Sequence, residues 1–110
     1  MQTLTINGKE YAVKFSYSVI LDFCEKQGIE IYEFKGDFKI QTNAGIKQLS
    51  TFVRLAMLRG AEITGSECAL TVNDVVDAIF EDGELLTKVL QAIQNDMPVK
   101  KKESREVPAG

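Results

Sequence analysis

The sequence predicts an α+β domain that is mostly helical, with an N-terminal β-hairpin packed on a small bundle of about four helices. Strand-like alternation of apolar residues is confined to the first 15 positions, and helical spacing appears in several later segments. A chain of 110 residues is long enough for one hydrophobic core and too short for two. We therefore expect a single domain over residues 1–97, followed by a disordered, flexible charged tail over residues 98–110.

The hairpin is predicted by the stretch "TLTINGKEYAVKF", in which apolar residues alternate on both sides of Asn7-Gly8. Asparagine and glycine both tolerate positive φ, which the tight two-residue turn of a hairpin requires. Two strands alone are only marginally stable in water, so the helices that follow must cover their apolar face.

The first helix is expected from about residue 18 to about residue 27. Ser16 or Ser18 is available as its N-cap, and Gly28 stands where it would end. The residues that share its apolar face are Tyr17, Ile20, Phe23 and Cys24. Residues 29–44 mix aromatic and β-branched side chains around Gly36, so we predict an irregular connection in which a short helical turn fits.

The second helix is expected from Ile46 to about Ala61, in "IKQLSTFVRLAMLRGA", and it is apolar on more than one side. Two interpretations follow. The helix is either the centre of the domain's own core or part of a surface that contacts a client or another copy. The candidate protein-binding residues for the second interpretation are Phe52, Leu55, Met57 and Leu58.

Two further helices are predicted between residues 71 and 97, separated by a tight turn at Gly83. Thr71 and Asp74 have the spacing of a capping box at the start of the first, which spans about nine residues. The residues predicted for its apolar face are Val72, Val75, Val76 and Ile79. The residues predicted for the face of the longer second helix are Leu86, Val89, Leu90, Ile93 and Met97.

Little in the chain indicates catalysis. Histidine is absent, which removes the commonest general base and the commonest zinc ligand. Cys24 and Cys68 lie in apolar contexts and are expected to be reduced, packed thiols. The carboxylates in "FEDGE" lack the spacing of a calcium loop, and no glycine pattern matches a phosphate-binding loop. We predict a protein that is not an enzyme, with no catalytic, cofactor-binding or metal-binding residues.

Composition also bears on partners and location. The net charge is −3, and the last fourteen residues carry +2, which leaves −5 on residues 1–96. An acidic body disfavours nucleic-acid binding, because that affinity comes largely from basic residues. Most aromatic residues fall within the first 38 positions, where core packing explains them better than base stacking. No stretch has the length of a membrane span or the pattern of a secretory signal, so we expect no membrane partner and a cytoplasmic location.

The order of these parts resembles the tail assembly chaperones of long-tailed bacteriophages and prophages, of the type that begins with a hairpin. Three stretches carry the resemblance, over residues 1–97: "LTINGKEYAVKFSYSVILDFCEK", "LSTFVRLAMLRGA" and "LTVNDVVDAIFEDGELLTKVLQAI". The resemblance implies a homo-oligomeric chaperone of the bacterial host cytoplasm that binds the tape-measure protein and aids tail-tube assembly. The alternative is a small dimeric regulatory or antitoxin-like protein-binding module.

The resemblance also bears on the lysine run Lys100–Lys102. Many members of the family are made in two lengths by a programmed frameshift near the end of the first reading frame. Slippery sites are often A-rich and can encode successive lysines. The run therefore lies where such a site is expected, and the alternative is a solubilising charged tail without recoding. The codons decide between the two.

Overall fold

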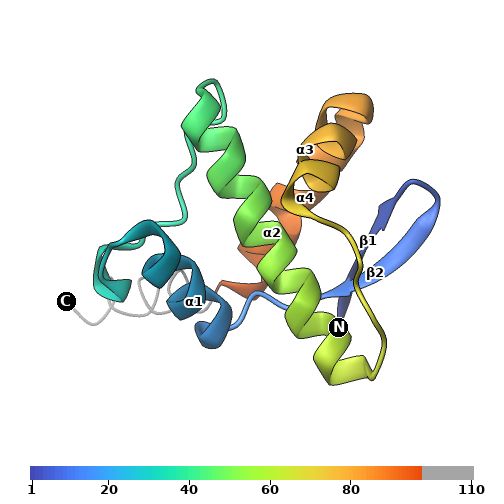
Figure 1. Ribbon diagram of the computed structural model, residues 1–110, viewed down its shortest axis with the longest axis horizontal. Coiled ribbons are helices and arrows are strands. Elements are labelled where there is room, and N and C mark those ends of the chain that lie inside the picture. The colour runs from blue at the N-terminus through green and yellow to red at the C-terminus, as the bar shows by residue number, and fades with distance from the viewer. Residues whose placement is uncertain (98–110) are drawn as a thin grey trace, which may run out of the picture.

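The computed structural model describes residues 1–97, and it confirms the predicted α+β class (Figure 1). The predicted charged tail and its lysine run lie outside the described residues. The elements in chain order are β1 (Gln2–Ile6), β2 (Lys9–Val13), α1 (Tyr17–Gln27), the 3-10 helix η1 (Ile31–Glu33), α2 (Asn43–Thr64), α3 (Val72–Glu81) and α4 (Gly83–Asp96).

The hairpin forms as the sequence predicts. Strands β1 and β2 are antiparallel, and Leu4 lies opposite Tyr11. The turn places Asn7 at φ 54° and Gly8 at φ 81°, the left-handed conformations that a tight hairpin turn needs. The inward-facing side chains Leu4 and Val13 are buried, because helices cover this face of the sheet.

Helix α2 is the centre of the domain and runs diagonally across the molecule in Figure 1. It contacts β2, α1 and α3, as expected for a central core helix. It begins earlier and ends later than the sequence pattern indicates. The side chain of Thr42 accepts a hydrogen bond from the N–H of Gly45 at 2.9 Å, and Gly65 ends the helix at φ 72°.

The hairpin meets α2 at backbone distance. The N–H of Lys14 donates a hydrogen bond to the carbonyl of Ala56 at 3.1 Å. One helical turn further on, a Cβ atom added to Gly60 would collide with the carbonyl oxygen of Ala12. Glycine is unfavourable in a helix interior, so its presence here is explained by this close approach.

Phe52 of α2 lies at the centre of a phenylalanine cluster. The ring centroids around it are 5.0 to 5.6 Å away and belong to Phe15, Phe23, Phe34 and Phe38. Aromatic pairs at these separations add stability beyond the area they bury. The prediction that the early aromatic residues pack in the core is therefore confirmed for these phenylalanines. It is wrong for Tyr17 and Tyr32, which are 57% and 83% exposed.

The capping box at the start of α3 is confirmed in both directions. The N–H of Asp74 donates to the Thr71 hydroxyl at 3.1 Å, and the N–H of Thr71 donates to the Asp74 carboxylate at 2.9 Å. On the predicted face of α3, Val75 and Ile79 are buried, whereas Val72 and Val76 are only partly covered.

The predicted face of α4 needs a correction. The buried residues of this helix are Leu85, Val89, Ala92 and Ile93. Leu86 is therefore only partly buried, and Leu90 is 37% exposed. Adjacent leucines at 85 and 86 fit a helical stripe almost equally well, and packing against α3 and β1 selects Leu85.

Candidate protein-binding site

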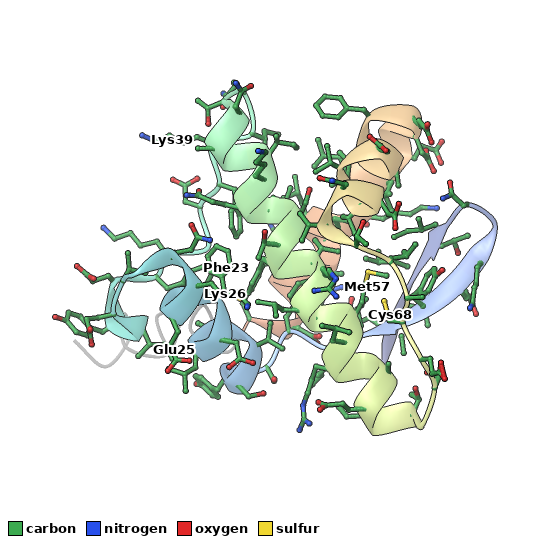
Figure 2. The ribbon with its side chains drawn as sticks, in the orientation of Figure 1. Phe23, Glu25, Lys26, Lys39, Met57 and Cys68 are labelled. Carbon is green, nitrogen blue, oxygen red and sulfur yellow. The ribbon has the colours of Figure 1, made fainter. Side chains whose placement is uncertain are left out.

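The structure separates the four residues predicted to bind a protein. Phe52 and Met57 are fully buried, Phe52 in the phenylalanine cluster and Met57 facing β2. Figure 2 shows Met57 close to Cys68 of the connection before α3. Because α1, β2 and α3 surround α2, these two side chains belong to the core of the domain and are not available as a surface in this conformation.

Leu55 and Leu58 lie on the uncovered side of α2 and are brought together. They are three residues apart, so they share one face of the helix, and both are half-buried. They line a groove between α1 and α2 with a volume of about 440 Å³. We call it the α1–α2 groove, and its lining residues are Ser18, Val19, Asp22, Leu55, Leu58, Arg59 and Glu62.

The groove has an apolar floor and a polar rim. Val19, Leu55 and Leu58 supply the floor. A shallower hollow continues past Leu55 along the outer side of α1, beside Glu25 and Lys26. Such a combination suits the apolar face of a peptide or helix, because the floor supplies burial and the rim supplies orientation.

Arg59 supplies an unused hydrogen-bond donor at this rim. Its Nη1 atom is 3.2 Å from the carboxylate of Glu62, an ion pair one helical turn away. Its Nε atom is buried and has no hydrogen-bond partner within residues 1–97. A buried N–H without a partner is costly, whereas the side chain as a whole is 42% exposed and leaves the guanidinium within reach of a bound molecule.

Helix α1 carries a second apolar stripe, which includes Tyr17 of the predicted face and also Leu21. Tyr17 and Leu21 are 57% and 46% exposed. They stand one residue before Ser18 and Asp22, which line the groove. Their spacing of four residues was the available signal. This spacing is not conspicuous in the sequence, because Ile20, Phe23 and Cys24 already account for a complete buried face of the helix.

No group of three or more metal-ligating side chains occurs within residues 1–97. Burial raises the pKa of the Cys24 thiol, and the charges of Glu30 and Glu33 raise it further, which disfavours the reactive thiolate. In the same part of the chain, no helix combines the length and apolar character needed to cross a membrane.

No protein-family model matches this chain, and no curated protein or solved structure is significantly similar to it. The resemblance to tail assembly chaperones consequently depends on the order of the elements alone.

Proposed function

We propose that the protein is a non-enzymatic tail assembly chaperone of a phage or prophage, which holds apolar segments of the tape-measure protein in the α1–α2 groove. The observation that carries this proposal is the uncovered apolar floor beneath a polar rim. The family resemblance, which the order of a hairpin followed by helices carries, is a second support for the proposal. We place this action in the cytoplasm of the bacterial host, where tail-tube subunits are also available.

A chaperone of this kind has to bind reversibly. Leu55 and Leu58 are already half-buried, so covering each of them gains only about 1 kcal/mol. One groove therefore binds one apolar segment weakly. A long client with many such segments binds many copies at once, and linkage between neighbouring sites raises the overall affinity without new contacts.

The charged residues of the rim would set the orientation of a bound client helix. The Arg59 side chain is 42% exposed, and its guanidinium is suited to a carbonyl oxygen, such as those at the C-terminal end of a client helix. Asp22 stands across the same groove and is suited to a basic or N–H group. A client helix would therefore place its C-terminal end toward Arg59.

Co-expression tests the proposal. The full chain is produced together with the tape-measure protein encoded near its gene, and the soluble, co-purified client is measured. The test variant is Leu55→Asp with Leu58→Asp, which puts charges on the groove floor. The matched control is Ile63→Asp with Leu90→Asp, at positions that are 47% and 37% exposed and outside the groove.

The chaperone proposal requires that the wild-type chain and the control keep the client soluble and that the groove variant does not. Thermal melts and circular dichroism establish first that both variants fold. If all three chains behave alike, the groove is not the client site. If the wild-type chain is a stable dimer that ignores the client, a regulatory or antitoxin-like module is the better account.

A further inference from the structure

Strand β1 forms one edge of the two-stranded sheet and presents main-chain groups on its outer side. The two-residue turn makes Ile6 and Lys9 a hydrogen-bonded pair, and hydrogen-bonded pairs alternate along an antiparallel ladder. The N–H and C=O groups of Thr3 and Thr5 consequently point away from β2. Within residues 1–97, these groups make no hydrogen bond to a neighbouring element.

The corresponding edge of β2 is covered by α2. The same alternation directs the carbonyl of Ala12 and the N–H of Lys14 away from β1. The Ala12 carbonyl faces Gly60, and the Lys14 N–H donates to the carbonyl of Ala56 at 3.1 Å. These contacts confirm the direction of the outward groups, and they close the sheet on the side of β2.

Helix α4 reaches β1 from the apolar face of the sheet and not along the outer edge. The Gln2 side chain donates to the Ala92 carbonyl at 2.8 Å, and Gln2 shares its face of the strand with the buried Leu4. Thr3 and Thr5 point to the opposite face and are exposed. In Figure 1 the hairpin stands at one side of the molecule. A further strand therefore has access to the edge of β1.

The sequence of β1, "QTLTI", has none of the features that usually protect an exposed edge. Edge strands of monomeric proteins commonly carry charged side chains, proline or a bulge, which prevent pairing with another chain. β1 contains no charged residue and no proline, and its register with β2 runs from Gln2 to Ile6 without a bulge. Its exposed threonines are β-branched and favour extended structure. The edge is therefore suited to the addition of a strand.

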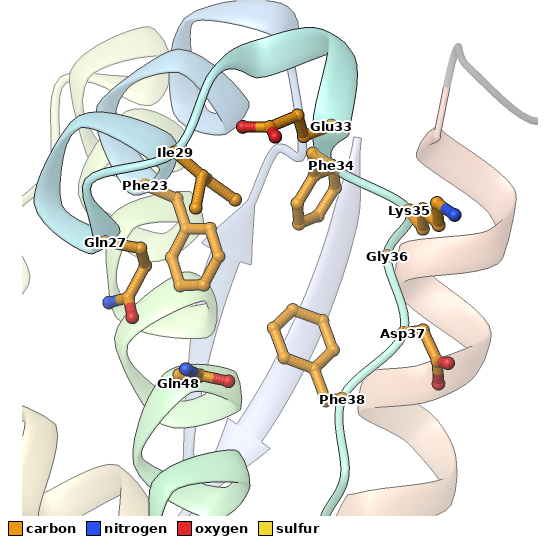
Figure 3. Close-up of a pocket in the computed structure, with 10 residues that line it drawn as sticks. All are labelled: Phe23, Gln27, Ile29, Glu33, Phe34, Lys35, Gly36, Asp37, Phe38 and Gln48. Carbon is orange, nitrogen blue, oxygen red and sulfur yellow. The ribbon is translucent and has the colours of Figure 1, made fainter.

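The hollow between α1 and the connection before α2 offers a second copy less (Figure 3). Phe23, Phe34 and Phe38 point toward one another there, with ring centroids 5.7 to 6.2 Å apart. Phe23 and Phe34 are only 3% and 7% exposed. Because these two rings are already buried within the domain, covering the hollow would remove little more of their apolar surface from water.

A second copy of β1 is the strand that fits the open edge. Antiparallel pairing centred on Leu4 overlaps the whole of Gln2–Ile6, and it places Thr3 of one copy opposite Thr5 of the other. Each of these pairs exchanges both main-chain hydrogen bonds, and the buried face stays continuous across the two sheets. The contact is uncharged, so it avoids the repulsion between bodies that each carry −5 over residues 1–96.

We propose that two copies of the chain associate by antiparallel pairing of β1 with β1, which forms one four-stranded sheet in the order β2-β1-β1-β2. Both outer strands of this sheet are then β2, whose edge α2 covers, so the assembly closes at two copies. No residue of β1 lines the α1–α2 groove, and each copy keeps its own groove. The inference does not rest on the function proposed for that groove.

Sedimentation of the full chain at about 1 µM to about 1 mM measures this association. The molar mass of the wild type should rise from that of one chain to that of two. Thr3→Lys with Thr5→Lys puts like charges directly opposite each other and should weaken the association about tenfold. Circular dichroism establishes that each variant folds.

The matched variant is Thr3→Lys with Thr5→Glu, which changes the same two exposed side chains. Opposite charges then meet in both pairs, so this variant should associate at least as tightly as the wild type. Only the double-lysine variant makes the acidic body less negative. General repulsion between the two bodies therefore predicts the reverse order of affinities, and the comparison separates the two explanations.

Amide hydrogen exchange locates the contact within β1. Exchange at Thr3 and Thr5 should slow by about tenfold once about nine-tenths of the chains are paired, because only the free chain exposes these amides. The amide of Leu4 is bonded to β2 and should be protected at every concentration. This alternation between neighbouring residues is specific to pairing along the edge.

Three results would overturn the inference. One is a wild-type mass of a single chain at every concentration. Another is undiminished association of the double-lysine variant, which would place the contact on a different surface. The third is exchange at Thr3 and Thr5 that stays equally fast while the mass doubles. None of these measurements includes a client, so the proposal for the α1–α2 groove keeps its own test.

Discussion

The backbone N–H of Phe15 donates a hydrogen bond to the side-chain carboxylate of Asp96 at 3.1 Å, which joins the end of the hairpin to the last turn of α4. A second bond supports the same closure, because the side-chain amide of Gln2 donates to the carbonyl of Ala92 at 2.8 Å. These contacts connect the two ends of the described chain. They also place α4 against β1, so that the sheet's apolar face is covered.

Replacing Asp96 tests this closure. Asp96→Ala leaves the N–H of Phe15 without its acceptor in a partly buried position, which should lower the free energy of unfolding by about 1–3 kcal/mol. Asp96→Asn keeps an acceptor oxygen and should lose less. Urea unfolding measures both. Lys14→Ala is the control, since its ammonium is 4.0 Å from the Asp96 carboxylate and its side chain is 43% exposed. If Lys14→Ala proves as damaging as Asp96→Ala, the ion pair and not the backbone bond closes the fold.

Gly60→Ala tests the close approach between hairpin and helix. The added Cβ would meet the carbonyl of Ala12, and relief requires a backbone shift that should cost about 1–3 kcal/mol. Gly83→Ala is the matched control in α4, because nothing lies within 4 Å of its added Cβ. The control should be neutral or gain up to about 1 kcal/mol from helix propensity. Equal stability of the two variants in thermal unfolding would contradict the packing described here.

Replacement of Ser50 by alanine should be tolerated, although this side chain is buried. Its side chain is fully buried, and its hydroxyl has no hydrogen-bond partner within residues 1–97. Ser50→Ala should therefore leave stability unchanged or raise it by about 0.5 kcal/mol, because no bond is lost and alanine favours a helix. Thr71→Ala is the contrasting variant, since it removes the α3 cap and should cost about 1 kcal/mol. A marked loss with Ser50→Ala, measured by urea unfolding, would reveal a partner for this hydroxyl.

Because the Cys24 thiol is buried, we expect the free energy of unfolding to depend on pH. Its pKa is raised above the ordinary value of 9.0, mainly by burial and also by the charges of Glu30 and Glu33. The folded state then holds the proton more tightly than the unfolded state. Stability attributable to this thiol is complete below the unfolded pKa and falls as the pH rises toward the folded pKa.

Urea unfolding at about pH 8 and about pH 10 measures this effect. The wild-type chain should lose more stability between the two conditions than Cys24→Ala, which carries no thiol at this position. Cys68→Ala is the matched control, because Cys68 is only partly buried. It should follow the wild-type profile. Identical slopes for the wild type and Cys24→Ala would contradict the burial of an un-ionised thiol.

Local signals explain what the sequence could predict. Asn7-Gly8 specifies the hairpin turn, Gly28 ends α1 in the left-handed conformation, and Thr71 with Asp74 caps α3. Each of these depends on residues that are close in sequence. They are sufficient for the order of elements and therefore for the fold class.

Long-range packing explains what the sequence could not predict. Periodicity shows that α2 is apolar on several sides, and only the tertiary fold decides that Phe52 is fully buried while Leu55 is half-buried. The same applies to Leu85, which packs inward in place of its neighbour Leu86. The contact of Gly60 with Ala12 joins segments that are far apart in the chain, so a single sequence contains no sign of it.

The α1–α2 groove is the centre of the functional proposal, and mapping it by NMR tests the proposal most directly. Overlapping peptides from a phage tape-measure protein, the client that the proposal assigns to this chain, are added to the ¹⁵N-labelled full chain, and amide shifts are followed. We predict that at least one apolar peptide shifts the amide signals of Ser18, Asp22 and the α2 segment Leu55–Glu62. The same peptide should leave those amides unshifted in the Leu55→Asp with Leu58→Asp variant. Shifts confined to other surfaces, or none with any peptide, would contradict the account.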